Sequence, residues 1–402
     1  MDLTSNEPFW LVKNGLVYAY PSLKENIETD ILIVGGGITG ALMANQCIED
    51  GYKTTLIDRR EIANGSSSAT TSMLQYEIDT PLYKLIEMIG KEGAEANYWA
   101  GIESIKTLGE IVKKIKSDCG FEVKESLFYA AFKKDLPDLI KEFEARKAAG
   151  FEVTWLEEEE IEKKYNLHQT HGGILSKKGG SIDAFRFVHD LLQYNLQKGL
   201  AVFDKTNTES TTYKKDKVIV TTDYGNTITA NKVIYCNGYE STEMIKEKFV
   251  DLLSSYVIIS EPMENIPKNI HNTLFWDTAE PYIYLRTTDD NRLLIGGEDE
   301  DFKDPIKRDQ LLSAKSEKLK KKIDKLFPDL NFRTDFKWAG TFGETKDGLP
   351  YIGEHPDFKN SYFLLGFGGN GITFSVTGTK VISDMLHGKQ HPLAKYFRFK
   401  RD

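Results

Sequence analysis

The residues with the most evident chemistry are glycines. Gly35, Gly37 and Gly40 form the pattern G-x-G-x-x-G directly after the apolar run 31–34. The first glycine of such a pattern permits a tight turn, the second lets a pyrophosphate approach the backbone, and the third lets a helix pack closely on a strand. Asp58 ends the next apolar run, about twenty residues further on, where a carboxylate can hold ribose hydroxyls. This spacing predicts a dinucleotide site; the alternative is a glycine-rich turn without a ligand.

A second glycine-rich segment, G-F-G-G-N-G at 366–371, stands between an apolar run and a helical pattern near the C-terminus. The N-terminus of the helix that follows would offer free N–H groups and a partial positive charge to an anionic group. Reduced flavin carries such a negative charge, so the segment favours a flavin over a nicotinamide nucleotide. A helix cap with packing glycines is the alternative.

Between these two segments, the run G-S-S-S-A-T-T-S at 65–72 consists of small residues, most of which carry a hydroxyl. Such a run lets the chain pass close to a flat ring and to phosphates, although a flexible surface loop has the same composition. Arg59 and Arg60 follow Asp58, and an arginine at this place can accommodate a 2′-phosphate. Because the carboxylate is already present, we expect an unphosphorylated ribose.

The elements that must position these residues are of two kinds. Apolar periodicity predicts strands at 31–34, 53–58 and 121–132, helices at 39–50, 182–198 (with Asp183 as its cap) and 307–326, a hairpin turning at 224–226, and a strand, loop and helix within 362–386. Parallel-sheet units therefore occur at the start, in the middle and at the end of the chain, with antiparallel-looking blocks between them.

This alternation predicts an α/β plus α+β fold with two domains. The first is a Rossmann-like dinucleotide-binding domain assembled from 1–85, 150–245 and 335–402. The second is an inserted antiparallel-sheet substrate domain formed by 86–149 and 246–334. Discontinuous domains of this kind follow from the order of the segments along the chain.

Composition excludes several other classes of protein. The 402 residues carry a net charge of −9 with mixed signs and no dense basic stripe, so we expect no nucleic-acid partner. The three cysteines lie far apart, His168, His171 and His189 lack metal-ligand spacing, and the N-terminal residues lack the basic region of a signal peptide. The most apolar window, 31–44, is too short to span a bilayer. We expect a cytoplasmic enzyme without a metal.

Several segments, taken in order, resemble one family. They are Y-P-S-L at 20–23, the G-x-G-x-x-G pattern, G-G-S-I-D-A-F-R-F-V at 179–188, Y-I-Y-L-R-T-T-D-D-N-R-L-L-I-G-G at 282–297 and W-A-G-T-F-G-E-T-K-D-G-L-P-Y-I-G at 338–353. From about Tyr20 to its C-terminus the chain resembles the D-amino-acid oxidase family of FAD-dependent oxidoreductases, the group that includes glycine oxidase, sarcosine oxidase and γ-glutamylputrescine oxidoreductase.

The resemblance implies that the dinucleotide is FAD and that residues from five parts of the chain contact it. Those residues are Gly35, Gly37, Ile38, Thr39, Gly40, Asp58, Arg59, Ser66, Ser67, Thr71, Val202, Gly369, Asn370, Gly371, Ile372 and Thr373. Sarcosine oxidase links its flavin through a cysteine in the segment that matches 338–347. This chain has no cysteine there, so we expect non-covalent FAD.

The chain departs from the family where small amino acids are held. The two basic residues that bind the carboxylate in sarcosine oxidase fall at Gln75 and Thr373, which are neutral. Recognition of a carboxylate needs a cation, so a small amino acid is a doubtful substrate. The lysine that promotes reaction with oxygen falls near Leu294, which leaves oxygen and another electron acceptor both open.

Several side chains are candidates for the substrate pocket. Tyr282, Tyr284 and Arg286 alternate, so in a strand they share one face. Gln75 and Trp338 complete this set, whose expected role is positioning rather than proton transfer. Glu77 and Asp79 follow the 65–72 segment and could attract a cationic amine, or could be solvated acids.

The expected reaction is oxidation of the C–N bond of an amine or amino-acid derivative. Hydride passes to flavin N5, and the imine is hydrolysed in water. No protein base is required when the amine binds deprotonated, and the flavin supplies the redox chemistry. Two alternatives remain open: an NAD-type dehydrogenase that uses the single G-x-G-x-x-G pattern, and a flavin-binding protein without amine oxidase activity. The amine, the electron acceptor and the oligomeric state stay open.

Overall fold

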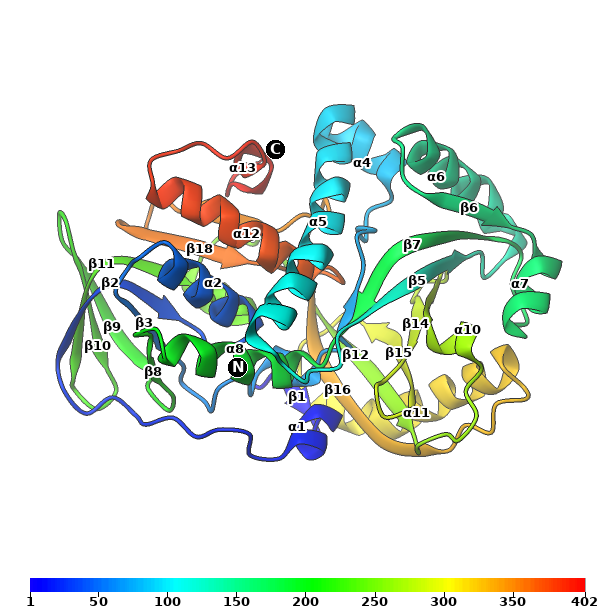
Figure 1. Cartoon of the computed structure of the whole chain (residues 1–402), viewed down its shortest axis with the longest axis horizontal. Helices are drawn as coiled ribbons and strands as arrows, with labels where there is room; N and C mark the ends of the chain where they lie inside the picture. Colours follow the sequence, from blue (N-terminus) through cyan, green and yellow to red (C-terminus); the bar gives the residue numbers. More distant parts are fainter. Residues whose placement is uncertain (402) are drawn as a thin grey trace.

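The computed structural model describes residues 1–401, which form two mixed β-sheets with helices packed around them (Figure 1). The eight-stranded sheet has the order β17-β18-β11-β2-β3-β8, with β10 and β9 continuing from β11. Its strands are β2 (Ile27–Val34), β3 (Thr54–Ile57), β8 (Ala201–Phe203), β9 (Thr208–Tyr213), β10 (Val218–Thr222), β11 (Thr227–Tyr235), β17 (Tyr351–Glu354) and β18 (Ser361–Leu365).

The middle of this sheet is parallel, since β2 pairs in parallel with both β3 and β11, and β18 pairs in parallel with β11. Its strands are apolar on both faces because both faces are covered, and Leu32, Ile33 and Leu56 are completely buried. Four helices pack together on one side of the sheet (Figure 1): α2 (Ile38–Glu49), α5 (Lys91–Ile115), α8 (Ala184–Leu196) and α12 (Gly371–Leu386).

The ten-stranded sheet has the order β1-β16-β12-β15-β14-β13-β5-β7-β4, with β6 beside β7. Its strands are β1 (Thr4–Ser5), β4 (Met73–Leu74), β5 (Glu122–Tyr129), β6 (Val153–Leu156), β7 (Gly173–Ser181), β12 (Asp251–Ser260), β13 (Thr273–Asp277), β14 (Ile283–Thr287), β15 (Leu293–Glu300) and β16 (Thr334–Glu344). The amphipathic helix α11 (Pro305–Leu326) packs on β12, β15 and β16 through Leu319 and Ile323.

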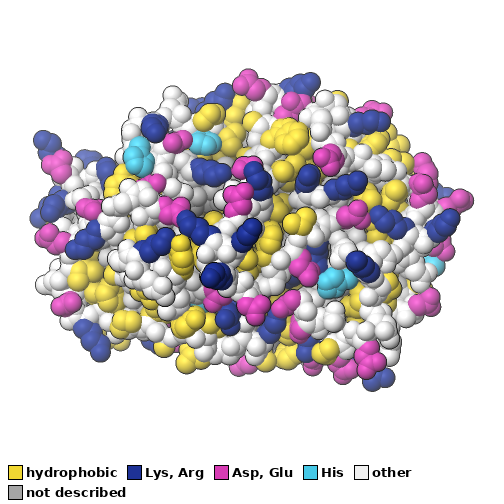
Figure 2. Space-filling view, viewed as in Figure 1, with side chains coloured by type: hydrophobic (Ala, Val, Ile, Leu, Met, Phe, Trp, Pro, Cys, Tyr) yellow, Lys and Arg dark blue, Asp and Glu magenta, His cyan; other side chains and the backbone are white. Residues whose placement is uncertain are grey.

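The remaining helices, most of them of eight residues or fewer, complete the fold. They are α1 (Phe9–Asn14), α3 (Ser66–Ala69), α4 (Leu82–Ile89), α6 (Leu136–Ala148), α7 (Glu158–Tyr165), α9 (Ser241–Met244), α10 (Lys268–His271) and α13 (Ala394–Phe397), with single 3₁₀ turns at Lys133–Asp135 and Gly238–Glu240. No helix among residues 1–401 is both long and apolar enough to cross a membrane. On the face drawn in Figure 2, basic and acidic side chains are interspersed.

Many of the predicted elements are confirmed. Asp183 caps α8 by accepting a hydrogen bond from the Arg186 backbone N–H, and β10 and β11 form the hairpin expected around 224–226. The domain boundaries differ from the expectation, because β6, β7 and β16 lie in the ten-stranded sheet although 150–245 and 335–402 were assigned to the other domain. In addition, α5 packs on α8 and α12, and it also contacts β7 of the ten-stranded sheet. The reason is physical: periodicity shows that a segment is a strand or a helix, but not which sheet it joins.

Candidate active site

A single large cavity of about 960 Å³ is lined by residues of both sheets. One end lies against β2, α2 and β3 of the eight-stranded sheet, and the other reaches β5, β13 and β14 of the ten-stranded sheet. The volume is at the upper end of the usual range for small-molecule sites. The cavity is therefore large enough for a cofactor together with a substrate.

The N-termini of two helices open on this one cavity. Gly37, Ile38 and Thr39 bring the start of α2 to its wall, and Gly371 and Ile372 bring the start of α12. Neither N-cap residue makes a side-chain hydrogen bond to its own helix, and the positive ends of both helix dipoles face the cavity; at the start of α2 the Ile38 N–H is bonded to the Ser67 hydroxyl.

The two helices are also tied to each other. A hydrogen bond of 2.8 Å joins the Thr39 and Ser375 hydroxyls, which fixes the starts of α2 and α12 side by side. Two bare helix N-termini that converge on one elongated cavity fit a dinucleotide such as FAD, with pyrophosphate at one mouth and an electron-rich ring at the other.

Close backbone contacts require glycine both in the turn before α2 and in the first turn of that helix. Gly35 has φ +113, and a Cβ built there would lie 2.5 Å from the Cys236 carbonyl oxygen. A Cβ at Gly40 would lie 1.8 Å from the Gly35 carbonyl oxygen. Gly40 therefore serves the packing of α2 against the β2 turn, and it does not itself line the cavity.

Asp58 lies at the end of β3 on the cavity wall and is already held by backbone donors. Its two carboxylate oxygens accept hydrogen bonds from the Gly36 N–H at 2.6 Å and the Arg60 N–H at 2.8 Å. Burial raises the pKa of this carboxyl group to about 6, against the opposing effect of these hydrogen bonds. Arg59 and Arg60 also line the cavity, and both guanidinium groups pair with Glu240.

The segment 65–72 crosses the cavity between its two ends. Ser66, Ser67 and Thr71 line the wall, and the Ser67 hydroxyl accepts a hydrogen bond of 2.9 Å from the Ile38 N–H. The other side of the segment is held from behind by donors to its backbone carbonyls. The Trp338 indole N–H donates to Ala69 O at 2.9 Å, and the Arg286 guanidinium donates to Thr71 O at 2.6 Å.

Arg286 and Trp338 are thus placed one layer behind the wall, in contrast to the expectation that they line the pocket. Arg286 does lie on the same side of β14 as Tyr284, but its guanidinium is completely buried under the 65–72 segment, where it also donates to Ile182 O at 3.0 Å. Burial lowers the pKa of Arg286 to about 10. The alternation in the sequence could not show that a loop would cover this residue.

Most of the other expected site residues meet on the wall. Those that line the cavity are Gly35, Gly37, Ile38, Thr39, Asp58, Arg59, Ser66, Ser67, Thr71, Gln75, Tyr282, Tyr284, Gly369, Gly371 and Ile372. Those that lie behind it are Gly40, Val202, Arg286, Trp338, Asn370 and Thr373. Of these, Asn370 uses its side-chain amide to donate to the Gln75 and Glu77 carbonyls, and Val202 packs within β8.

The end of the cavity beyond Gln75 has a wall of acids and aromatic rings, which we call the acidic chamber. It is defined by Glu77, Asp79, Phe128, Trp276, Tyr282 and Tyr284. Phe128 on β5 stacks on Trp276 on β13 at 3.7 Å between ring centroids, and the Tyr282 and Tyr284 rings lie 5.6 Å apart. Sequence reasoning missed Phe128 and Trp276 because only the pairing of β5 with β13 brings them together.

The acids of the chamber follow from a local alternation. Gln75, Glu77 and Asp79 line the cavity, whereas the intervening Tyr76 and Ile78 are buried in the hydrophobic core. The segment is extended enough that successive side chains point to opposite sides. Charged residues at every second position of a segment that otherwise enters the core were the signal that could have identified this wall.

Negative charge accumulates at this end. Asp79 accepts a hydrogen bond of 2.8 Å from the Gly369 N–H, and because protein surrounds the carboxyl group, desolvation raises its pKa to about 6 even though the side chain faces the open cavity. Burial, with Asp79 and Asp299 nearby, raises the pKa of Glu344 to about 7. Burial likewise raises the pKa of Asp299 to about 6.

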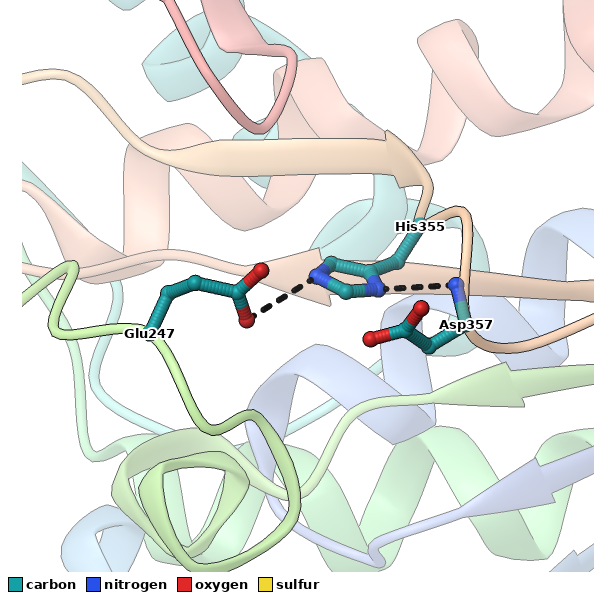
Figure 3. A group of neighbouring side chains, drawn as sticks. All are labelled: Glu247, His355 and Asp357. Carbon is teal, nitrogen blue, oxygen red and sulfur yellow. Dashed lines mark hydrogen bonds and ion pairs between the residues drawn. The ribbon is translucent and has the colours of Figure 1, made fainter.

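A group of potential metal ligands lies away from this cavity. Glu247, His355 and Asp357 offer ligand atoms within 4.8 Å of one another, and Figure 3 shows the His355 ring between the two acids. However, the His355 Nδ1 accepts a hydrogen bond of 3.3 Å from the Asp357 N–H. A neutral imidazole that accepts at Nδ1 carries its proton at Nε2 and has no lone pair left for a metal. The Nε2 instead faces Glu247 at 3.8 Å.

Comparison with known proteins identifies the family of this chain. A family model described as FAD dependent oxidoreductase matches residues 30–385. The chain is 24% identical to γ-glutamylputrescine oxidoreductase of Escherichia coli over 92% of its own length and 86% of that protein. It is 22% identical to a Bacillus subtilis protein named for a Rieske 2Fe-2S iron-sulfur protein, over 97% of its own length and 75% of that protein.

The fold has counterparts among solved structures. Glycine oxidase from Geobacillus kaustophilus superimposes with a TM-score of 0.77 at 20% sequence identity, covering 93% of this chain and 99% of that one. At this level of identity the likeness concerns the fold: a dinucleotide domain joined to a second, sheet-based domain.

Proposed function

The chain belongs to the family of FAD-dependent oxidoreductases, and we propose that it oxidises the C–N bond of a small amine or amino-acid derivative. The observation that carries this proposal is the single cavity in which two open helix N-termini meet a chamber lined by Tyr282, Tyr284 and carboxylates. FAD, when bound, supplies the two-electron chemistry by accepting a hydride from the carbon next to nitrogen.

The residues of the chain would bind and orient both molecules. Gly37, Gly371 and their helices present N–H groups to the anionic parts of the cofactor, and Asp58 stands where ribose hydroxyls are expected. With no cysteine between Trp338 and Asp347, the chain offers no thiol for a covalent link in that segment. We propose non-covalent binding.

Tyr282 and Tyr284 would hold the substrate at the chamber end of the cavity. Burial raises the pKa of Tyr282, so its phenol stays protonated and donates a hydrogen bond rather than acting as a base. The amine then has to bind with its reacting nitrogen deprotonated, and water hydrolyses the imine after oxidation. Gln75, also on the wall, is a neutral hydrogen-bonding partner for the substrate.

The electron acceptor is oxygen or another oxidant. The lysine that promotes reaction with oxygen in sarcosine oxidase falls near Leu294 of this chain. Leu294 is completely buried in the core and supplies no cation. Reoxidation of the reduced enzyme by oxygen, measured against an artificial acceptor, separates an oxidase from a dehydrogenase.

The proposal is tested on purified protein. We expect it to be yellow, to release its flavin into the supernatant on acid precipitation, and to be bleached anaerobically by an amine from a panel of amino acids, N-methyl amino acids and polyamines. Colourless protein that binds NAD and not FAD would favour an NAD-type dehydrogenase. Yellow protein that no amine bleaches would favour a flavin-binding protein without amine oxidase activity.

A further inference from the structure

The charge of the acidic chamber carries information about the substrate that the family does not supply. Glu77 lies in the cavity wall with its side chain closed off by protein, and neither of its carboxylate oxygens has a hydrogen-bond partner among residues 1–401. A buried carboxylate without hydrogen bonds is costly, and its negative charge favours a cation in the adjoining cavity.

One buried cation lies near Glu77, but it is shared. The Arg146 Nη1 is 3.5 Å from Glu77, whereas its Nε donates to Glu142 at 2.6 Å. Two carboxylates against one guanidinium leave a net negative charge. Arg146 is completely buried and does not line the cavity, so it is not exposed to bind the carboxylate of a substrate.

Asp79 adds a second charge on the same wall. Its side chain is exposed to the cavity, and the structure gives it a single hydrogen bond, from the Gly369 N–H. Behind Tyr284, one oxygen of Asp299 is buried without a hydrogen-bond partner among the described residues. Among those same residues, the cations on the wall of this end are Lys84 and Lys134, and both side chains are exposed to solvent.

The aromatic rings of the chamber suit the same kind of ligand. Phe128, Trp276, Tyr282 and Tyr284 present ring surface between the carboxylates and the 65–72 segment. Aromatic faces attract ammonium groups and also cover the methylene chain between two such groups. A carboxylate at this place would meet the charge of Asp79 and that of Glu77, which shares the Arg146 guanidinium with Glu142, and this disfavours it.

We propose that the substrate is a diamine or polyamine without a free carboxylate, whose second ammonium group binds to Asp79, close to the buried charge of Glu77, while the first nitrogen is oxidised. This inference rests on the proposed amine oxidation and names its substrate class. Two ammonium groups in one cavity lower the pKa of each other, so the reacting nitrogen loses its proton more readily while the distal ammonium stays paired with acids. The chamber thereby supplies the deprotonated amine that the reaction requires.

The test compares three probes of equal chain length on the holoenzyme: 1,4-diaminobutane, n-butylamine and 4-aminobutanoate. The concentration that half-saturates the rate of anaerobic flavin reduction should be at least about tenfold lower for the diamine than for butylamine, as expected for one added charge-assisted contact. The carboxylate-bearing probe should be the poorest. Preference for 4-aminobutanoate, or for an α-amino acid over the diamine, would overturn the inference and leave amine oxidation intact.

A second measurement does not depend on turnover. In holoenzyme reduced with dithionite, where the amine cannot be oxidised, 1,4-diaminobutane should raise the midpoint of thermal unfolding and 4-aminobutanoate should not. If no amine bleaches the flavin, the proposed oxidation fails, yet this shift still decides the binding inference: an absent diamine shift overturns it, and a selective shift supports it.

Variants connect the effect to the residues. Asp79→Asn should raise the half-saturating concentration of the diamine about tenfold and change that of butylamine less, because only the diamine has a second charge to lose. Glu77→Gln should act in the same direction, with circular dichroism to show that Arg146 has not unfolded the chain. Glu317→Gln, an exposed acid on α11, is the matched control and should change neither value. Equal loss of both amines in Asp79→Asn would show that the carboxylate does not read the second charge.

Discussion

The two ends of the cavity differ in what forms their walls. At the cofactor end, the positive groups are backbone N–H donors at the starts of α2 and α12, with Arg59 and Arg60 beside them. In the acidic chamber the wall carries Glu77 and Asp79 between aromatic rings. One continuous cavity therefore has helix N-termini and arginines at one end and exposed Asp79 among aromatic rings at the other, which suits an anionic dinucleotide at the first and a cationic substrate at the second.

The two ends also respond differently to their surroundings. Backbone N–H groups do not titrate, so the two helix N-termini keep their polarity at any ordinary pH, and the titrating group beside them is Asp58, whose pKa burial raises to about 6. The carboxyl groups of the chamber end do titrate, and burial raises the pKa of Asp79 to about 6. We therefore expect backbone substitutions to affect cofactor binding, and charge or pH changes to affect substrate binding.

The largest effect is expected from Gly40→Ala at the cofactor end. Its Cβ would lie 1.8 Å from the Gly35 carbonyl oxygen, so α2 must move away from the β2 turn and its N-terminus leaves the cavity. FAD affinity should fall at least about 100-fold, near 2.7 kcal/mol, as measured by titrating apoprotein with FAD.

Gly51→Ala, just beyond the other end of α2, is the control for Gly40→Ala. A Cβ there has no atom within 4 Å, and its φ of +86 costs stability without touching the cavity. This variant should lose about 1 kcal/mol of stability but keep its flavin. A yellow Gly40→Ala protein with unchanged thermal stability would contradict the proposed role of this contact.

Reversing the charge of the acidic chamber should have the next largest effect. Asp79→Arg places a guanidinium where the second ammonium is expected, so kcat/KM for 1,4-diaminobutane should fall about 100-fold and that for 4-aminobutanoate should rise. Asp138→Arg makes the same change of charge on the wall at an exposed residue of α6, and should alter either value less than about threefold. Similar losses in both variants would mean that only the net charge matters.

The cofactor end could be predicted from the sequence because its determinants are local. Gly35, Gly37 and Gly40 lie within six residues, and the turn, the helix start and the neighbouring strand follow from that spacing. The C-terminal loop at 366–371 could be predicted for the same reason. That both helix starts reach one cavity depended on the parallel pairing of β18 with β11 and of β11 with β2, which the structure shows.

The acidic chamber could be predicted only in part, because its residues come from segments that meet through tertiary pairing. Tyr282 and Tyr284 were accessible from alternation, but Phe128 and Trp276 lie about 150 residues apart in the chain and come together where β5 and β13 pair. Arg286 shows the opposite limit. Its face on β14 was predictable, whereas its burial under the 65–72 segment was not.

Arg286→Lys sharpens the comparison, because Arg286 supports the segment that separates the two ends. Its guanidinium donates to Thr71 O and Ile182 O at the same time. A lysine has one nitrogen on a shorter side chain and cannot make both hydrogen bonds. FAD affinity should fall about tenfold through a loosened 65–72 segment, as measured by the change in flavin fluorescence on binding.

The control for Arg286→Lys is Arg292→Lys, near the start of β15. Arg292 pairs with Asp290 and Asp335 at the protein surface, away from the cavity wall. This variant should change FAD affinity less than about twofold, since pairs of this kind contribute little. If Arg286→Lys also leaves the affinity unchanged, the two hydrogen bonds do not position the segment.

The smallest effect is expected in the dependence of stability on pH. Burial raises the pKa of Asp299 to about 6 and that of Glu344 to about 7, so the folded chain binds more protons than the unfolded chain above pH 4, and the free energy of unfolding falls as pH rises through about 4 to 7. In the diamine-free enzyme, these acids should therefore destabilise the fold at pH 7.5, where they are charged, and less so at pH 5.5, where they are protonated. The midpoint of thermal unfolding measures this difference. Asp299→Asn should raise stability at pH 7.5 by about 1 kcal/mol, or roughly 2 °C, and flatten the pH dependence.

Asp347→Asn is the control and should lower stability at pH 7.5, because that carboxylate accepts two hydrogen bonds from the Arg401 guanidinium. A destabilised Asp299→Asn protein would mean that the carboxylate is favourably held, and that the negative charge of the chamber end is compensated within the fold rather than left for a cationic ligand.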